Sequence, residues 1–144
     1  MATLARLRKW LMAVLAVALA GTLVELLLLA HYEEPWQFVP LALIVAALGT
    51  IGWHTVRPSA AVVRGIQVVM TLCVVAGVTG VVFHLRGAAE FQREIDPSMT
   101  TRELLSKALR AQSPPALAPG VMSQIGLIGL IAVYRDPALE GRDA

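Results

Sequence analysis

Four apolar stretches separated by more polar segments dominate the sequence. Residues 39–56, 65–85 and 117–134 contain no Asp, Glu, Lys or Arg, and residues 10–30 contain one such residue, Glu25. Each stretch is close to the ~20 residues that an α-helix needs to cross the hydrocarbon core of a bilayer. The pattern predicts an all-α integral membrane protein with spans at about residues 10–30, 38–56, 64–86 and 117–134. All four belong to a single membrane domain covering residues 1–144.

The segment between the third and fourth spans, residues 87–116, is predicted to be an outer loop that contains its own helix. Span three keeps its helical spacing of apolar positions as far as Ile95 and should stop at Asp96. A second helix should begin at Thr100, because Thr100 and Glu103 have the spacing of a capping box. Its apolar stripe comprises Leu104, Leu105, Ala108 and Leu109. Such a short amphipathic helix lies at the headgroup level, covers the loop side of the bundle, or is a solvated helix that packs on its own loop.

The distribution of basic residues predicts that both termini lie in the cytoplasm. Arg6, Arg8 and Lys9 precede the first span, and the connection 57–64 contains Arg57 and Arg64. The connection 31–36 contains two acids and no Lys or Arg. Because cytoplasmic connections are enriched in Lys and Arg, we expect an N-in, C-in protein of the bacterial inner membrane, with residues 135–144 as a cytoplasmic tail.

The N-terminus has a second interpretation, a cleaved secretory signal peptide. Basic residues, an apolar run and the small pair Ala18 and Ala20 follow one another in the order typical of such peptides. The apolar run continues through Leu29, however, which gives it full spanning length. This length favours an uncleaved first span.

Composition excludes several classes of protein. The chain is 57% hydrophobic and 15% charged, which excludes intrinsic disorder. Its net charge of +2 and its aromatic content of 6% argue against a nucleic-acid-binding protein. Cys73 is the single cysteine, so the chain is neither a disulfide-stapled secreted domain nor a thiol–disulfide exchange enzyme.

Small residues recur at helical spacing within the spans and predict how the helices pack. Helices in lipid associate through such residues because small side chains let two backbones approach closely. The candidates for packing are Ala42, Ala46, Gly49, Gly77, Gly80, Gly126 and Gly129. A compact bundle of four transmembrane helices follows from this pattern.

Glu25 is the most informative polar residue, because an ionisable group near the centre of a span costs about 2.5–3.5 kcal/mol on insertion scales. Thr79 and Gln124 are expected at a comparable depth and could hydrogen-bond its carboxyl group. Three interpretations remain open: a polar lock between helices, a proton- or cation-linked carboxylate, and a buried contact with another subunit.

Two histidines, His31 and His84, are expected at the outer boundary of the membrane. Together with Glu33 and Glu90 they are candidate metal ligands, and as a pair they could hold a haem iron. Their spacing is irregular, however, and the nearby glycines of span three suggest helices packed too closely for a macrocycle. We therefore expect no catalytic residues, no haem and no tightly held metal ion. His54 is expected at the inner boundary, remote from any shared site.

The function most consistent with this sequence is that of a small, non-enzymatic integral membrane subunit that docks or stabilises a larger membrane protein complex. Its expected partners are the lipid bilayer and other membrane-protein subunits, without nucleic acid. Two alternatives remain: a redox, metal- or haem-binding membrane protein using His31 and His84, and a small proton-coupled carrier using Glu25.

Overall fold

The computed structural model describes residues 2–110 and 117–140, and within these ranges the secondary structure is entirely helical. Residues 111–116 of the predicted outer loop and residues 141–144 of the predicted tail lie outside the described residues. The elements are α1 (Ala2–Leu28), a 3₁₀ turn η1 (Pro35–Gln37), α2 (Phe38–Val56), α3 (Ala60–Ile95), α4 (Thr101–Leu109), α5 (Leu117–Ala132) and α6 (Pro137–Glu140).

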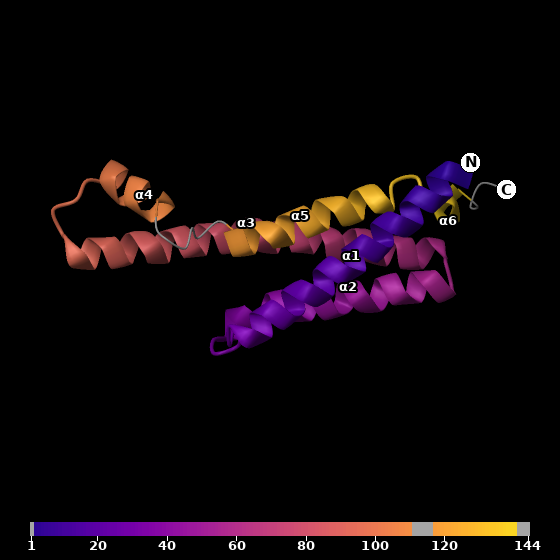
Figure 1. Ribbon diagram of the computed structural model, residues 1–144, viewed down its shortest axis with the longest axis horizontal. Coiled ribbons are helices and arrows are strands. Elements are labelled where there is room, and N and C mark those ends of the chain that lie inside the picture. Colours follow the sequence, from indigo (N-terminus) through magenta and orange to yellow (C-terminus); the bar gives the residue numbers. More distant parts are fainter. Residues whose placement is uncertain (1, 111–116, 141–144) are drawn as a thin grey trace.

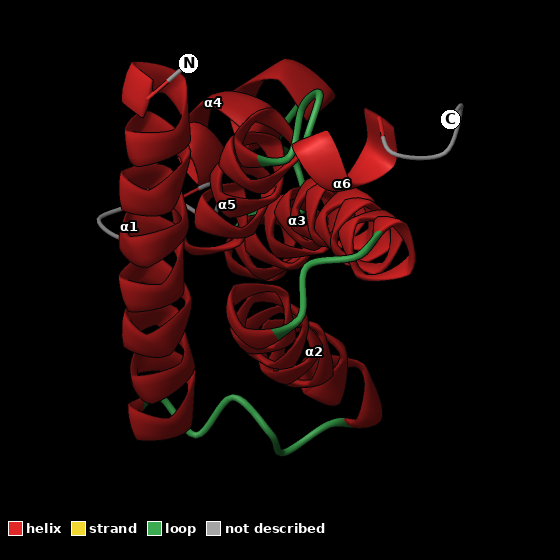
Figure 2. Cartoon of the chain, turned by 90° about the vertical axis from the view of Figure 1, so that its right-hand side faces the viewer, coloured by secondary structure: helices red, strands yellow, loops and turns green. Residues whose placement is uncertain are grey.

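The helices run back and forth along one long axis (Figure 1). α3 is the longest element, and α5 lies along it in the opposite direction. α1 crosses this pair and α2 returns beside α3, as the view turned by 90° also shows (Figure 2). One end of the molecule carries the N-terminus, the α2–α3 turn and α6, and we call it the termini end. The opposite end carries the α1–α2 turn and α4, and we call it the arm end.

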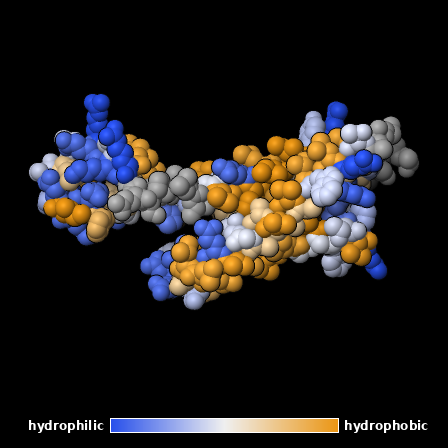
Figure 3. Space-filling model, viewed as in Figure 1, coloured by the Kyte–Doolittle hydropathy of each residue, from blue (hydrophilic) through white to orange (hydrophobic). Residues whose placement is uncertain are grey.

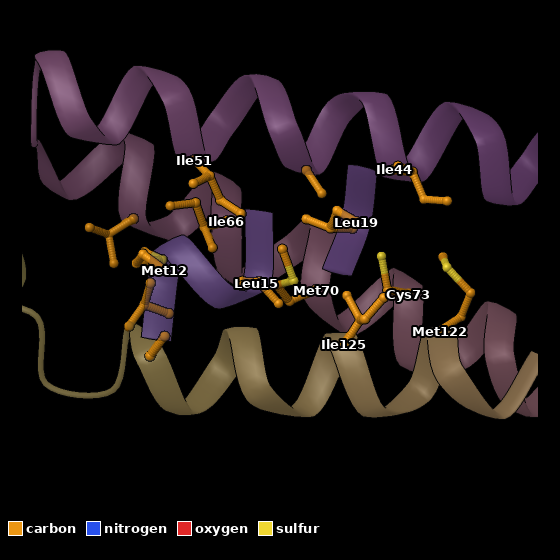
Figure 4. Packing of buried hydrophobic residues seen from close by; sticks show 14 residues of the cluster. Met12, Leu15, Leu19, Ile44, Ile51, Ile66, Met70, Cys73, Met122 and Ile125 are labelled. Atoms are coloured by element: carbon orange, nitrogen blue, oxygen red, sulfur yellow. The ribbon is translucent and has the colours of Figure 1, made fainter. Parts of the chain in front are cut away.

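The core lies where α1, α2, α3 and α5 meet (Figure 4). α1 contributes Met12, Leu15 and Leu19, whose spacing of three and four residues places them on one face of the helix. The other helices add apolar residues at the same spacing, which include Ile44 and Ile51 of α2, Ile66, Met70 and Cys73 of α3, and Met122 and Ile125 of α5. Burial of these side chains explains why the four helices pack as one unit.

Three helical segments are long and apolar enough to cross a membrane: Thr3–Leu28, Pro35–Val56 and Ala60–Ile95. Apolar side chains also cover much of the outside of the packed helices, while polar side chains gather at the two ends (Figure 3). The fourth predicted span corresponds to α5, whose apolar part, Pro119–Ala132, is shorter than the other three. The chain is thus an all-helical protein with the features of a membrane protein.

Local signals for helix ends are confirmed. α3 extends beyond the predicted membrane segment and ends at Ile95, directly before Asp96. α4 begins after Thr100, and the reciprocal capping box of Thr100 and Glu103 is present. Leu104 and Ala108 of α4 are buried, and α4 packs against α3. α4 thus packs on the extension of α3, and its depth relative to the headgroups stays a prediction.

The small residues fall into two groups. Gly77 and Gly80 face α5, and Gly126 and Gly129 face α3, at positions where a side chain would collide with the neighbouring helix. An added Cβ on Gly80 would lie 2.8 Å from Cβ of Pro119. Ala42, Ala46 and Gly49 differ from the expectation, since all three lie on the exposed side of α2. α2 packs instead through Ile44, Ala47 and Ile51, because a face with two isoleucines buries more apolar surface than a face of small residues alone.

Candidate functional site

The most extensively bonded polar site lies at the termini end and consists of Arg8, His54 and Asp136, which we call the terminal polar cluster. Nε of Arg8 lies 3.7 Å from Oδ2 of Asp136. The same Arg8 nitrogen donates a hydrogen bond of 3.0 Å to the carbonyl oxygen of Ala132. Nη2 of Arg8 donates to the carbonyl oxygens of Tyr134 at 3.0 Å and Arg135 at 3.1 Å. One guanidinium group thus holds the whole segment that follows α5.

Local backbone structure explains how Asp136 reaches this position. Arg135 has φ 48°, a left-handed conformation that turns the chain sharply after α5. Asp136 then accepts a hydrogen bond of 3.0 Å from the backbone N–H of Ala138 and caps the short helix α6. Asp136 is only 3% exposed. A carboxylate buried to this degree requires a charged or hydrogen-bonding partner, which Arg8 supplies.

His54 completes the cluster from α2. Its Nε2 lies 3.5 Å from Oδ2 of Asp136. Within the part of the chain that the structure describes, this nitrogen is buried and has no hydrogen-bond partner. Sequence reasoning placed His54 outside any shared site and treated Arg8 only as an orientation signal, so it missed the cluster. The one local signal was the pair Asp136 and Pro137 directly after an apolar stretch, which is typical of a helix start.

The second candidate site is the histidine pair at the arm end. The rings of His31 and His84 are stacked, with centroids 6.5 Å apart and planes inclined by 21°. The turn after α1 brings His31 there, because Ala30 adopts a left-handed φ of 51° and His31 donates its backbone N–H to Leu26 at 2.9 Å. A non-glycine residue in this conformation stores strain. The structure therefore brings together the two histidines that the sequence proposed as a pair.

The surroundings of this pair affect its chemistry. Burial lowers the pKa of His31, and the neighbouring His84 lowers it further. Both causes disfavour the charged imidazolium, so the neutral ring, which can bind a metal, is favoured. The glycines of span three that suggested helices packed closely near this pair, Gly77 and Gly80, pack against α5 and not against α1. The close packing that they mark therefore lies between α3 and α5.

The proposed carboxylate ligands differ in their placement. The backbone N–H of Glu33 donates to the side chain of Gln37 at 2.8 Å, and the Glu33 side chain is exposed. Glu90 is exposed on the extension of α3. Among residues 2–110 and 117–140, no group of three or more His, Cys, Asp or Glu side chains is arranged to hold a metal ion.

The polar residues predicted to lie within the membrane do not meet inside the packed helices. Glu25, Thr79 and Gln124 are all exposed. Glu25 lies two positions after Leu23, which packs against the core, so its side chain points to the opposite side of α1. A carboxylate that serves a carrier would face the other helices, and Glu25 does not.

The third candidate is the helical arm, which we define as residues 86–95 of α3 together with α4. α4 folds back on α3 at the left of Figure 1 and is joined to it through the buried side chains of Leu104 and Ala108. Four large apolar side chains of the arm are at least half exposed: Phe91, Ile95, Leu105 and Leu109. Phe91 and Ile95 on α3 lie one helical turn apart, and so do Leu105 and Leu109 on α4.

Comparison with known protein families, with curated proteins and with solved structures finds no match for this chain. Its function is therefore argued from its own residues.

Proposed function

We propose that this chain is a small, non-enzymatic integral membrane subunit that docks or stabilises a larger membrane protein complex. In this proposal it crosses the bacterial inner membrane four times, with both termini in the cytoplasm and the helical arm outside. The observation that carries the docking role is the arm itself, a packed pair of helices with exposed apolar side chains beyond the predicted spans.

Exposed apolar groups have different consequences in lipid and in water. Along the spans they contact acyl chains, which need no further cover. Phe91 and Ile95 are 60% and 63% exposed on the arm, where the predicted surroundings are aqueous. Apolar surface that remains exposed to water marks an interaction site. The capping box and the buried Leu104 keep the arm folded, so it presents this surface without first having to order.

The positions of the charged connections support this topology. The basic connection 57–64 lies at the termini end, and the acidic connection 31–36 lies at the opposite end. α5 is short for a span, yet Arg8 bonds to Ala132 at its end and to Tyr134 just beyond it, which anchors this end at the level of the first residues of α1. Cysteine labelling tests this topology. Glu34→Cys and Ser106→Cys in a Cys73→Ser background should react with an impermeant maleimide in intact cells, and reaction only after permeabilisation would reverse the orientation.

The docking role is tested by extracting the protein, together with any bound partner, from its native membrane into polymer nanodiscs. The parent chain should run in an assembly larger than its monomer, and Phe91→Glu with Ile95→Glu should release the monomer. Glu94→Gln, an exposed change on the same helix, serves as the matched control and should leave the assembly intact. If the double variant stays in an assembly of unchanged size, the arm does not dock a partner.

A second function, metal or haem binding, is favoured by the histidine pair. A metal ion about 2.1 Å from one nitrogen of each imidazole lies about 3.2 Å from each ring centroid, so a shared ion permits centroid separations up to roughly 6.4 Å. The observed 6.5 Å lies just beyond this limit, so a shared ion requires the two stacked rings to move closer and to turn a nitrogen towards it. Metal analysis and visible absorbance of the purified protein test the idea. Stoichiometric metal or a Soret band that disappears in both His31→Ala and His84→Ala would place this function first.

A further inference from the structure

The side of α1 that faces away from the other helices carries a carboxyl group within an apolar surface. We call the surface formed by Val14, Val17, Gly21, Glu25 and Leu28 the free face of α1. All five residues are exposed, and their spacing of three and four places them in one row along the helix. The opposite row, which includes Leu15 and Leu19, is buried in the core. Only one side of α1 is therefore packed against other helices of this chain.

Glu25 cannot reach water easily from this position. It precedes Leu28, which is 82% exposed, and Leu29, which is 65% exposed, so apolar side chains lie between it and the end of the helix. Glutamate is too short to extend past a full turn of helix as lysine and arginine do. An ionisable group in such surroundings is seldom left facing lipid and normally pairs with an oppositely charged or hydrogen-bonding group.

Gly21 lies one turn before Glu25 on the same face. Nothing lies within 4 Å of the position that a Gly21 side chain would occupy. The glycine therefore leaves a notch beside the carboxyl group. A notch of this kind lets a second transmembrane helix approach the backbone closely enough for an interhelical hydrogen bond.

We propose that the free face of α1 binds a transmembrane helix of a partner protein that carries a basic residue at the depth of Glu25. Charge complementarity identifies the occupant, because a lysine or arginine satisfies the carboxylate without a change in protonation. A second copy of this chain fits less well. Two copies related by a twofold axis along the membrane normal would place their Glu25 carboxylates opposite each other, and like charges at short range repel.

The inference rests on the proposed role as a membrane subunit but concerns a surface separate from the helical arm. Its experiment therefore uses purified full-length protein in phosphatidylcholine vesicles and needs no native complex. The probes are synthetic Leu/Ala transmembrane peptides that carry Lys at the depth of Glu25 or Leu at the same position. Energy transfer between labelled protein and labelled peptide measures association.

The Lys peptide should associate about tenfold more tightly than the Leu peptide, a difference of about 1.4 kcal/mol. Glu25→Leu should remove this preference, and Gly21→Leu should weaken binding of the Lys peptide. Gly52→Leu is the matched control, because Gly52 of α2 is likewise exposed with nothing within 4 Å. It should leave binding unchanged.

Two results would overturn the proposal. Equal association of the Lys and Leu peptides with the parent protein would show that the carboxyl group does not select a basic helix. Energy transfer between two labelled copies of the protein, lost in Glu25→Leu, would assign the free face to self-association. The melting temperature of each variant in detergent is measured beside the binding. Glu25→Leu should melt like the parent because Glu25 is exposed, and Gly21→Leu should melt at the same temperature or higher because leucine favours helix over glycine.

Discussion

Nε of Arg8 lies 3.7 Å from Oδ2 of Asp136 and thereby joins the beginning of the first helix to the segment that follows the last apolar helix. This relationship explains how α5 stays in place although it is shorter than the other apolar helices. α5 is held along α3 by close packing and at its end by the guanidinium group. The carbonyl groups at the end of a helix lack partners within the helix, and here Arg8 supplies one for Ala132.

Replacing Arg8 should therefore loosen the C-terminal end of the molecule. Arg8→Ala removes three hydrogen bonds to backbone carbonyls and leaves the buried Asp136 carboxylate without its charged partner. We expect the free energy of unfolding to fall by about 2–3 kcal/mol, which is the range for lost hydrogen bonds to a charged group. Equilibrium unfolding in mixed detergent and SDS measures the change.

The control for this prediction is Arg6→Ala, because Arg6 is exposed on the same turn of α1. It should change the stability by less than about 0.5 kcal/mol, as is usual for surface substitutions. If Arg8→Ala unfolds at the same SDS fraction as Arg6→Ala, the terminal polar cluster does not secure α5.

The contact between α3 and α5 gives a second prediction. A Cβ added to Gly126 would lie 2.9 Å from the backbone nitrogen of Val74, and backbone cannot move aside as a flexible side chain can. Gly126→Ala should cost about 1–3 kcal/mol through overpacking. Gly49→Ala, on the exposed side of α2, should instead be neutral or stabilising, since Ala favours helix over Gly by about 1 kcal/mol. Equal effects of the two substitutions in SDS unfolding would contradict the packing role of Gly126.

The sequence allowed the helix ends to be predicted better than the faces. Pro, Asp and the capping box act on their own neighbours, so the C-terminal end of α3 and the start of α4 could be inferred locally. The packed face of α2 could not, because both a small-residue stripe and a branched-residue stripe have helical spacing. The choice between them depends on how much surface the neighbouring helices can bury.

The candidate sites were predictable to different degrees. His31 and His84 could be paired because each follows a long apolar stretch on helices that run in the same direction. Arg8, His54 and Asp136 come from three separate elements, and nothing in their spacing indicates that they meet. A buried polar cluster of this kind is a property of tertiary packing and becomes visible only in the folded chain.

The capping box of α4 gives a prediction about pH. The backbone N–H and the hydroxyl of Thr100 donate to Oε2 of Glu103 at 2.9 Å and 2.7 Å, and these bonds lower the pKa of Glu103. A carboxyl group whose pKa is lowered on folding stabilises the fold above its ordinary pKa. This contribution is lost as the pH falls through the lowered value. Hydrogen-exchange protection of residues 101–109, corrected for intrinsic rates, should therefore be greater at pH 7 than at pH 3.

Glu103→Gln provides the comparison for this effect. It keeps the shape of the side chain but replaces the charged acceptor with a neutral one, so α4 should exchange faster than in the parent at pH 7. At pH 3, below the ordinary pKa of a glutamate, the parent loses part of this charge and the difference between the two proteins should shrink. A difference that is the same at both pH values would mean that the carboxylate charge does not stabilise α4.

The histidine pair can be tested without any assumption about a bound ion. Burial is the larger cause of the lowered pKa of His31, and the charge on His84 is the smaller. His84→Ala should therefore raise the pKa of His31 part of the way back towards its ordinary value, which is about 6.5. Because folding lowers the pKa of His31, its neutral form stabilises the turn after α1 above the ordinary pKa, and this stabilisation is lost as the pH falls through the lowered value.

Titration of ¹⁵N-histidine signals by NMR measures the change in the pKa of His31 that His84→Ala produces. His54→Ala, at the opposite end of the molecule, should not produce it. An unchanged His31 titration in His84→Ala would mean that the two rings do not interact in solution.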